Sequence, residues 1–335
     1  MIITRTPFRI PLGGGSTDLR AYYEKHGGFI FSVTVNLYMY VGINRPPIDD
    51  LIRLKYHDNE TVASPHELKN RLAKAALLRT GFDRMIEISS KADVPNGTGL
   101  GSSGTYLVGL LNALHSLKGE NISRRQLAEE AYEITSELGL PDGMQDPYAV
   151  SFGNFSAFTI GVDGKVVVEN VDVSRKTQEC FEKQTLFFYT GVTRSSEELL
   201  REQQQKIKRG EKKALELKHQ IKEIGQKIHN AFKTNNLDTF GHLMDEHWNF
   251  KKSMSNKMSN SAFDEVYKKA KKAGALGGKI LGAGGGGFFL MYAMEGSEDK
   301  VRKVFEKYKM REVPIRVDSG GTQILVNRPR FNNTI

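Results

Sequence analysis

The first third of the chain consists of short apolar runs rich in β-branched and aromatic residues, separated by glycine and polar residues. Three segments have this character: "MIITRTPFRI" (1–10), "FIFSVTVNLYMYVGI" (29–43) and "MIEISS" (85–90). Such runs are typical of strands in a packed sheet. Between the second and third of them, residues 65–80 ("PHELKNRLAKAALLRT") have apolar positions at helical spacing, which predicts a helix there.

The middle of the chain begins with an apolar run over 106–117 that has no polar face, which predicts a buried helix. Ser123 and Gln126 have the spacing of a capping box, so a further helix is expected from there to about residue 138. Residues 154–171 alternate around Asp163-Gly164, which is the pattern of a β-hairpin.

Helices are expected to dominate from residue 195 to about 272, after a strand at 185–192. Between 201 and 233, one apolar stripe consists of Leu217, Ile221, Ile224, Ile228 and Phe232. Lysines and glutamates are interleaved on the other side, which we expect to be a solvated face. The chain ends with strand character at 277–293, a helical segment at 297–308 and a strand at 311–321. We place a domain boundary between residues 165 and 185, and predict domains over 1–170 and 171–335.

Composition narrows the functional class. With 39% hydrophobic and 26% charged residues over 335 positions, the chain has the balance of a globular protein. Cys180 is the single cysteine, no apolar run approaches the roughly 20 residues of a membrane span, and the first residues lack a secretory core, so a cytoplasmic protein is expected. The net charge of +9 is not accompanied by interleaved aromatic residues, so we expect neither nucleic acid nor membrane as a partner. We expect the protein to be a monomer or a homodimer.

The segment "PNGTGLGSSGTYLVGLL" (95–111) places a glycine- and serine-rich loop directly before the buried helix. A helix start offers unpaired amides and a partial positive charge, and glycine lets phosphate oxygens approach the main chain closely. Gly99, Gly101 and Gly104 also fit the G-x-G-x-x-G pattern of dinucleotide folds, but their first glycine does not follow a strand directly. No G-K-[ST] sequence is present, which excludes a Walker A loop.

Two further motifs flank this loop: "PFRIPLGGGSTD" (7–18) and "KILGAGGGGF" (279–288). The three motifs, in this order and over nearly the whole chain, resemble those of the GHMP kinases. The resemblance implies an α+β, two-layer fold with a ribosomal-protein-like N-terminal domain and a ferredoxin-like C-terminal domain. It also implies ATP and Mg²⁺ in the cleft between them, and transfer of a phosphoryl group to an alcohol.

The resemblance assigns roles to individual residues of the loop. ATP would be held by Pro95, Gly97, Gly99, Leu100, Gly101, Ser102, Ser103 and Gly104. Ser103 matches the metal-binding serine of the family. For the second metal ligand we select Glu137, although Glu133 is an alternative and neither has the usual spacing from the catalytic aspartate.

Asp146, in "GMQDPYA" (143–149), matches the aspartate of the family that accepts the proton of the substrate hydroxyl. Arg9 would keep that carboxylate ionised, because an adjacent cation favours the charged form. The substrate would be bound by Gly14, Gly15, Ser16, Thr17, Asp18, Arg194, Gly284 and Gly285, with Arg194 as a clamp for a sugar phosphate. Without a substrate role, Asp18 would cap the helix that follows it.

Within the family, the chain is similar to the sugar 1-kinase branch that acts on heptose 7-phosphates. The similarity lies in "GGGSTD" (13–18, where the branch usually has "GGGTD"), "YTGVTRSSEELLREQ" (189–203) and "HWNFKKSM" (247–254). It implies phosphorylation of the anomeric hydroxyl of D-glycero-D-manno-heptose 7-phosphate. Alternatives are a kinase for fucose, galactose or a mevalonate-like alcohol, a non-catalytic sugar- or nucleotide-binding regulator, and a dinucleotide-dependent oxidoreductase.

Overall fold

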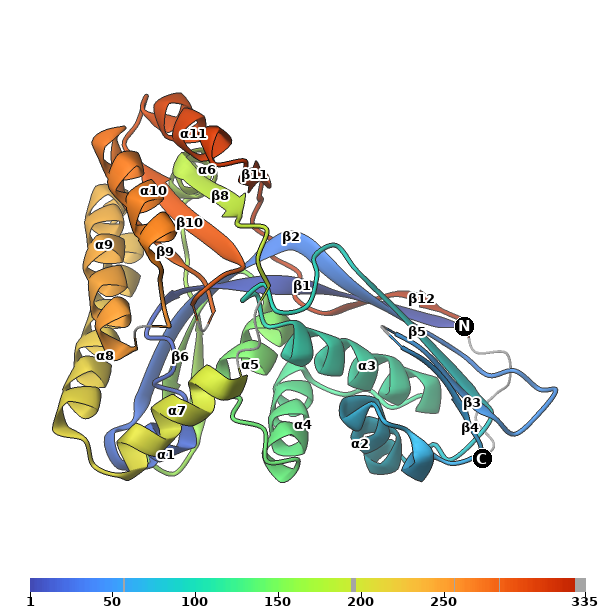
Figure 1. Cartoon of the computed structure of the whole chain (residues 1–335). Coiled ribbons are helices and arrows are strands. Elements are labelled where there is room, and N and C mark those ends of the chain that lie inside the picture. The colour runs from blue at the N-terminus through green and yellow to red at the C-terminus, as the bar shows by residue number, and fades with distance from the viewer. Residues whose placement is uncertain (57, 194–196, 256, 283, 329–335) are drawn as a thin grey trace.

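The computed structural model describes residues 1–56, 58–193, 197–255, 257–282 and 284–328, which form two sheets with helices packed around them (Figure 1). The strands are β1 (Ile2–Gly13), β2 (Gly28–Asn44), β3 (Ile52–Lys55), β4 (Asn59–Val62), β5 (Ile86–Ala92), β6 (Phe155–Ile160), β7 (Val166–Asn170), β8 (Thr185–Tyr189), β9 (Ala275–Ile280), β10 (Phe288–Ala293), β11 (Arg311–Glu312) and β12 (Gln323–Asn327). The helices are α1 (Arg20–His26), η1 (Pro65–Glu67), α2 (Arg71–Thr80), α3 (Ser102–Lys118), α4 (Arg124–Glu137), α5 (Gln145–Phe152), α6 (Arg175–Gln184), α7 (Glu197–Lys208), α8 (Lys212–Lys233), α9 (Leu237–Met254), α10 (Ser261–Lys272) and α11 (Glu298–Lys307).

The larger sheet is built on the long antiparallel pair of β1 and β2, which are connected through α1. Its strand order is β12-β1-β2-β5-β3-β4, and the hairpin β6–β7 joins through β2. Residues Gly28–Val33 of β2 pair with β6, whereas Met39–Asn44 pair with β5, so one strand connects both arms of the sheet. The buried helix α3 packs against β1 and β2, as the apolar run at 106–117 predicted.

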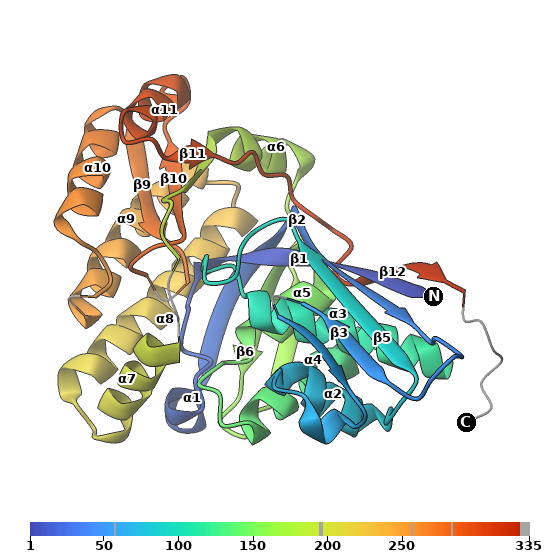
Figure 2. The same cartoon turned by 45° about the vertical axis from the view of Figure 1, so that its right-hand side comes forward.

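The smaller sheet has the strand order β11-β8-β10-β9, and all its pairs are antiparallel. Counted in chain order this is 4-1-3-2, the order of a ferredoxin-like domain, with helices α7 to α10 between the first and second strands. Figure 1 shows this sheet at the upper left with α9, α10 and α11, and Figure 2 shows the same arrangement turned by 45° about the vertical axis. The predicted α+β fold is confirmed.

Three details of the sequence-based fold differ from the structure. The predicted helix over 65–80 is interrupted: η1 ends at Glu67, and α2 starts only after Asn70, whose side chain caps it. The C-terminal strand β12 pairs with β1 in the larger sheet, so the last residues of the predicted second domain return to the first. The strand expected over 277–293 is a hairpin, because the glycine loop divides β9 from β10.

Helix α8 connects the two parts of the molecule through the predicted apolar stripe, whose five residues are all buried. Gly225 lies on the same face and allows close approach to the end of β1, since a Cβ there would lie 2.6 Å from the Gly14 nitrogen. Lys218 is also buried on this helix, at 1% exposure. The expectation that its lysines all face solvent was therefore wrong at one position. No helix in the described ranges has the length and apolar character that crossing a bilayer requires.

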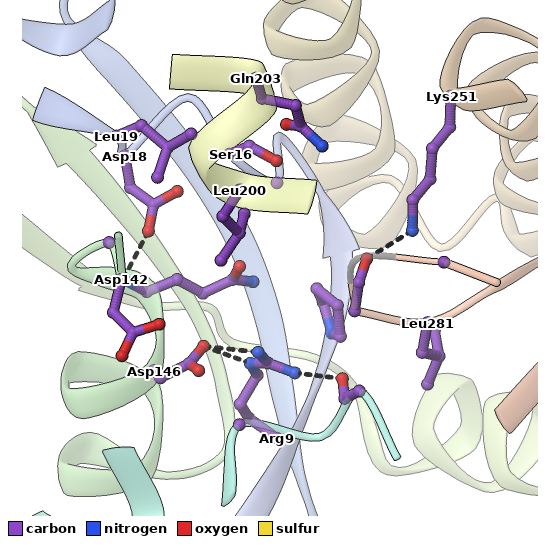
Figure 3. Close-up of a pocket in the computed structure, with 18 of the residues that line it drawn as sticks. Arg9, Ser16, Asp18, Leu19, Asp142, Asp146, Leu200, Gln203, Lys251 and Leu281 are labelled. Atoms are coloured by element: carbon purple, nitrogen blue, oxygen red, sulfur yellow. Dashed lines mark hydrogen bonds and ion pairs between the residues drawn. The ribbon is translucent and has the colours of Figure 1, made fainter. Parts of the chain in front are cut away.

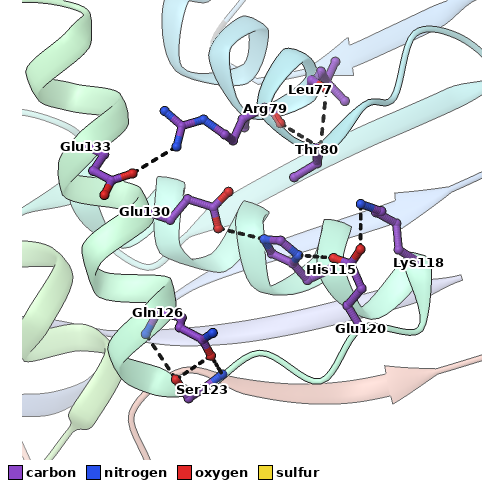
Figure 4. A network of polar contacts seen from close by, with 11 residues as sticks. Leu77, Arg79, Thr80, His115, Lys118, Glu120, Ser123, Gln126, Glu130 and Glu133 are labelled. Carbon is purple, nitrogen blue, oxygen red and sulfur yellow. Dashed lines mark hydrogen bonds and ion pairs between the residues drawn. The ribbon is translucent and has the colours of Figure 1, made fainter.

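The predicted capping box at the start of α4 is present (Figure 4). The Ser123 hydroxyl accepts a hydrogen bond from the Gln126 amide, and the Gln126 side chain accepts one from the Ser123 amide at 3.0 Å. We expect Ser123→Ala to lower the free energy of unfolding by about 1 kcal/mol, measured by urea denaturation, because it removes one of these bonds. Ser136→Ala, on the same helix but outside the cap, is the control and should change stability by less than about 0.5 kcal/mol.

Candidate active site

The pocket that contains the predicted motifs lies where the two sheets meet. It is lined by the end of β1, the loop before α3, the start of α5, the helices α7 to α9 and the loop between β9 and β10. These segments are far apart in the sequence, and the three motifs come together only in the fold. Figure 3 shows the charged side chains of Arg9, Asp18, Asp142, Asp146 and Lys251 around this pocket.

The glycine loop brings the N-terminus of α3 to the pocket. Gly101, at φ 80°, is the N-cap, and no side chain caps the first turn. The amides of that turn are therefore available to an anion, as predicted for a phosphate site. Ser102 supports this assignment, because its hydroxyl oxygen is buried and has no hydrogen-bond partner among the described residues.

The predicted ATP-binding residues divide into two groups. One group lines the pocket: Gly97, Gly99, Gly101, Ser102 and Ser103. The other three do not. Leu100 is fully buried in the core, the Pro95 carbonyl accepts a hydrogen bond from Thr98, and Gly104 packs against Asp146, where a Cβ would lie 2.7 Å from the Asp146 Cβ. These three residues shape the loop from behind.

Arg9 and Asp146 form an ion pair inside the pocket, as the sequence predicted. The Arg9 Nε donates to Asp146 Oδ1 at 2.7 Å, and Arg9 Nη2 lies 2.5 Å from the same oxygen. The remaining Nη1 donates to the Gly99 carbonyl at 2.7 Å, so the guanidinium connects the carboxylate to the glycine loop. The Asp146 side chain is 24% exposed and Arg9 only 7%, which leaves the carboxylate accessible from the pocket.

Asp18 is bound to the residue that precedes Asp146. Its Oδ2 accepts the backbone amide of Gln145 at 2.8 Å, and the Gln145 side chain donates to Ser32 at 2.8 Å. Burial, and to a lesser degree the charge of Asp146, raise the pKa of Asp18. Asp18 does not cap α1, which begins after Leu19 without a side-chain cap. The first motif therefore presents Asp18 to the pocket beside the ion pair.

Not every residue predicted from the first and third motifs faces the pocket. Gly15, Ser16 and Gly284 line it. Gly14 and Thr17 do not: the Thr17 hydroxyl donates to the Gly14 and Phe29 carbonyls at 2.8 and 2.9 Å, which fixes the turn after β1. Gly285 is likewise held in the loop, with its amide donating to the Met258 carbonyl. These three residues shape the loops beside the pocket, and a direct contact with a ligand stays a prediction for them. Arg194 lies outside the described residues.

Glu137, the residue selected as second metal ligand, lies outside the pocket. Its carboxylate accepts a hydrogen bond from Arg79 of α2 at 2.7 Å, and its side chain is 66% exposed, away from the pocket lining. Glu133 is bound by the same arginine at 3.0 Å (Figure 4). Glu133 and Glu137 pair with Arg79 because they lie on the face of α4 that packs toward α2. The spacing between a glutamate and the catalytic aspartate in the sequence does not show which way that face points. Within the described ranges, no cluster of three or more acidic, histidine or cysteine side chains could hold a metal ion.

Several residues of the pocket escaped the sequence analysis. Asp142 lies beside Asp146 in the pocket lining. The next residue, Gly143, must be a glycine because a Cβ there would lie 2.0 Å from the Asp18 Oδ2. His247, Lys251 and Lys279 line the opposite wall. His247 and Lys251 both belong to the motif "HWNFKKSM". Because they are four residues apart, they lie on the same face of a helix, and this spacing could have indicated that they act together.

Asp142 makes a testable contribution to stability. Burial, followed by the charge of Asp146, raises the pKa of Asp142 from 3.8 to about 6. A carboxyl group with a raised pKa in the folded state lowers stability as the pH rises from about 4 to 6, because the unfolded chain ionises first. Asp142→Asn should therefore stabilise the fold at pH 8, by up to about 3 kcal/mol for two pKa units. In thermal unfolding the gain should be much smaller at pH 4.5, and an equal gain at both pH values would contradict this account.

Comparison with known proteins identifies the family. The description "GHMP kinases N terminal domain" matches residues 67–154, and "GHMP kinases C terminal" matches residues 228–310. D-glycero-alpha-D-manno-heptose 7-phosphate kinase of Campylobacter jejuni is 30% identical over 305 residues, covering 87% of this chain and 89% of that protein. The chain belongs to the GHMP kinase family. It is therefore a kinase of the class that uses ATP.

Other GHMP kinases are similar over most of their length. Galactokinase of Pyrococcus furiosus is 24% identical over 326 residues, covering 85% of this chain and 87% of that protein. The crystal structure of a D-glycero-D-manno-heptose 1-phosphate kinase from Bacteroides thetaiotaomicron superposes with a TM-score of 0.80 at 24% identity. That match covers 97% of this chain and 99% of the other. This structural likeness agrees with the two-sheet arrangement described above.

Proposed function

We propose that this GHMP kinase transfers the γ-phosphoryl group of ATP to the anomeric hydroxyl of a sugar phosphate, D-glycero-D-manno-heptose 7-phosphate. The observation that carries the proposal is the Arg9–Asp146 ion pair, which lies between the open N-terminus of α3 and Asp18. This order of groups suits a nucleotide tail on one side and a polyol on the other.

In the proposed reaction, the amides at the start of α3 hold the polyphosphate, and Asp18 orients the acceptor by accepting hydrogen bonds from its hydroxyl groups. The acceptor oxygen forms a bond to the γ-phosphorus while the bond from that phosphorus to the β,γ-bridging oxygen breaks, and ADP leaves. Asp146 accepts the proton of the hydroxyl group. Arg9 holds the carboxylate in place and fixes the glycine loop through the Gly99 carbonyl. Most of the catalysis is then positioning and charge stabilisation.

Mg²⁺ fits this pocket in part. Ser103 lines it together with Ser102, whose buried hydroxyl has no hydrogen-bond partner among the described residues. Mg²⁺ is commonly held by few protein oxygens together with substrate phosphates and water. When bound, the ion would neutralise charge on the phosphates. We expect Ser103→Ala to raise the Mg²⁺ concentration needed for half-maximal activity several-fold, measured by ADP release. Glu137→Gln is the matched comparison and should leave it unchanged, because Glu137 pairs with Arg79. If only the Glu137 variant needed a higher Mg²⁺ concentration for half-maximal activity, Glu137 and not Ser103 would be the metal ligand.

The choice of acceptor is supported by the relative from Campylobacter jejuni and by the basic character of the pocket wall around Lys251 and Lys279. Fucose or galactose is the second candidate, because relatives of this chain are named as fucokinase and galactokinase. A screen of free sugars and sugar phosphates for ATP-dependent ADP release tests the choice. We expect the highest kcat/KM with heptose 7-phosphate, and a higher value with a free hexose would overturn the proposal.

A further inference from the structure

Basic side chains from the C-terminal half gather at and behind the wall of the pocket that α9 and β9 form. Lys218 comes from α8, His247 and Lys251 from α9, and Lys279 from β9. Lys218, His247 and Lys279 are 1%, 3% and 2% exposed, so three of the four are almost completely buried. Figure 3 shows Lys251 reaching toward the pocket on the far side from Asp18 and Asp142.

The lysine ammonium groups are held in fixed positions. Lys251 Nζ donates to the Ile280 and Gly282 carbonyls at 2.9 and 2.6 Å. Lys279 Nζ donates to the Leu12 carbonyl at 2.9 Å and lies 3.1 Å from His247 Nδ1. An ammonium group has three N–H donors. The contacts within the described ranges thus leave at least one donor on each lysine for a ligand in the pocket.

The charge of this wall is not balanced by the protein. Along the part of the chain that the structure describes, no carboxylate forms an ion pair or hydrogen bond with Lys251 or Lys279. Burial, and then the charge of Arg9, lowers the pKa of Lys251 to about 7. Burial, followed by the charges of Lys251 and Arg9, lowers the pKa of Lys279. Buried cations are costly unless paired, and a bound anion would supply the missing charge.

We propose that Lys251 and Lys279 bind the phosphate group that the acceptor already carries. This inference rests on the proposed function, in which the acceptor is a sugar phosphate. The tail of the nucleotide has its own site at the amides of α3, and the acceptor hydroxyl must lie at Asp146. Because Lys251 and Lys279 extend from the opposite wall, they suit the far end of the acceptor. Lys218 stays behind this wall, where its ammonium donates to Gln203 at 2.9 Å.

The test compares Lys251→Met and Lys279→Met with Lys252→Met as the matched control. Lys252 is the sequence neighbour, but its ammonium lies 3.7 Å from Asp264 and outside the pocket lining. The substrates are D-glycero-D-manno-heptose 7-phosphate and the same heptose without phosphate. We expect KM for the phosphorylated heptose to rise at least tenfold in both pocket variants. In the same two variants, KM for the free heptose and KM for ATP should change less than twofold. All kinetic constants of the Lys252 variant should also change less than twofold.

Equal losses on both heptoses would overturn the proposal, as would a rise confined to KM for ATP, which would assign the lysines to the γ-phosphate. Binding gives a second readout: heptose 7-phosphate should raise the Tm of the wild type, and the shift should shrink in the Lys251 variant, whose side chain is only partly buried. If the wild type itself does not prefer the phosphorylated heptose, the proposed acceptor is wrong. If the wild type prefers it and the variants keep that preference, only the role of the lysines is wrong.

Discussion

Asp146→Asn is expected to lower kcat by about 10²-fold or more while leaving the affinity for ATP unchanged. The amide has nearly the shape of the carboxylate but cannot accept the proton of the attacking hydroxyl. Arg9 orients the Asp146 carboxylate, with its Nε 2.7 Å from Asp146 Oδ1. The carboxylate is partly exposed to the pocket. Steady-state kinetics with saturating acceptor measures kcat, and titration with a fluorescent ATP analogue measures nucleotide affinity.

The matched control for this variant is Asp163→Asn in the turn between β6 and β7. That carboxylate is exposed, and the resulting Asn-Gly sequence is well suited to a hairpin turn. Its kcat should stay within twofold of the wild type. If Asp146→Asn also kept its kcat within twofold, Asp146 would have no role as the proton acceptor, and the chemistry proposed for this pocket would have to be reassigned.

Arg9→Lys is expected to lower kcat/KM by roughly 10- to 100-fold, even though the charge is kept. The guanidinium binds Asp146 with two nitrogens and the Gly99 carbonyl with a third. A lysine ammonium is a single point of charge and cannot reproduce this planar arrangement. Loss of charge-assisted hydrogen bonds of this kind is worth about 1.5–3 kcal/mol. Because Gly99 belongs to the glycine loop that we propose to hold the nucleotide, KM for ATP should rise together with the fall in kcat.

Arg5→Lys is the control for this substitution. Arg5 lies on the same strand, but its guanidinium donates to Gln323 at 2.9 Å and covers the ring of Tyr38 at 4.5 Å, outside the pocket lining. Its kinetic constants should change less than twofold. An Arg9 variant as active as the Arg5 variant would mean that the ion pair only stabilises the fold.

Much of the fold could be predicted because its signals are local. The alternation around Asp163-Gly164 and the capping box at Ser123 each depend on a few adjacent residues, and both are confirmed. The break of the predicted helix at Asn70 was missed, although its side chain accepts the Ala73 amide as a helix cap. The pairing of β12 with β1 depends on the far ends of the chain, and periodicity carries no information about that partner.

The candidate site divides in the same way. Glycine-rich segments and Asp146 could be found from motifs, because residues of these motifs themselves line the pocket. The position of Glu137 outside the pocket could not be predicted, because its partner, Arg79, lies on another helix and the pairing depends on packing. Lys279 was missed because its partner is the Leu12 carbonyl, 267 positions earlier in the chain. A lysine in a strand shows nothing unusual until the fold buries it.

In the proposed reaction, the N-terminus of α3 binds the polyphosphate of ATP directly beside Asp146. A crystal structure with a nonhydrolysable ATP analogue tests it most directly. The account predicts phosphate oxygens within hydrogen-bond distance of the Ser102 and Ser103 amides, with the γ-phosphate facing the Asp146 carboxylate. A polyphosphate bound at any other surface, with these amides left to solvent, would contradict it.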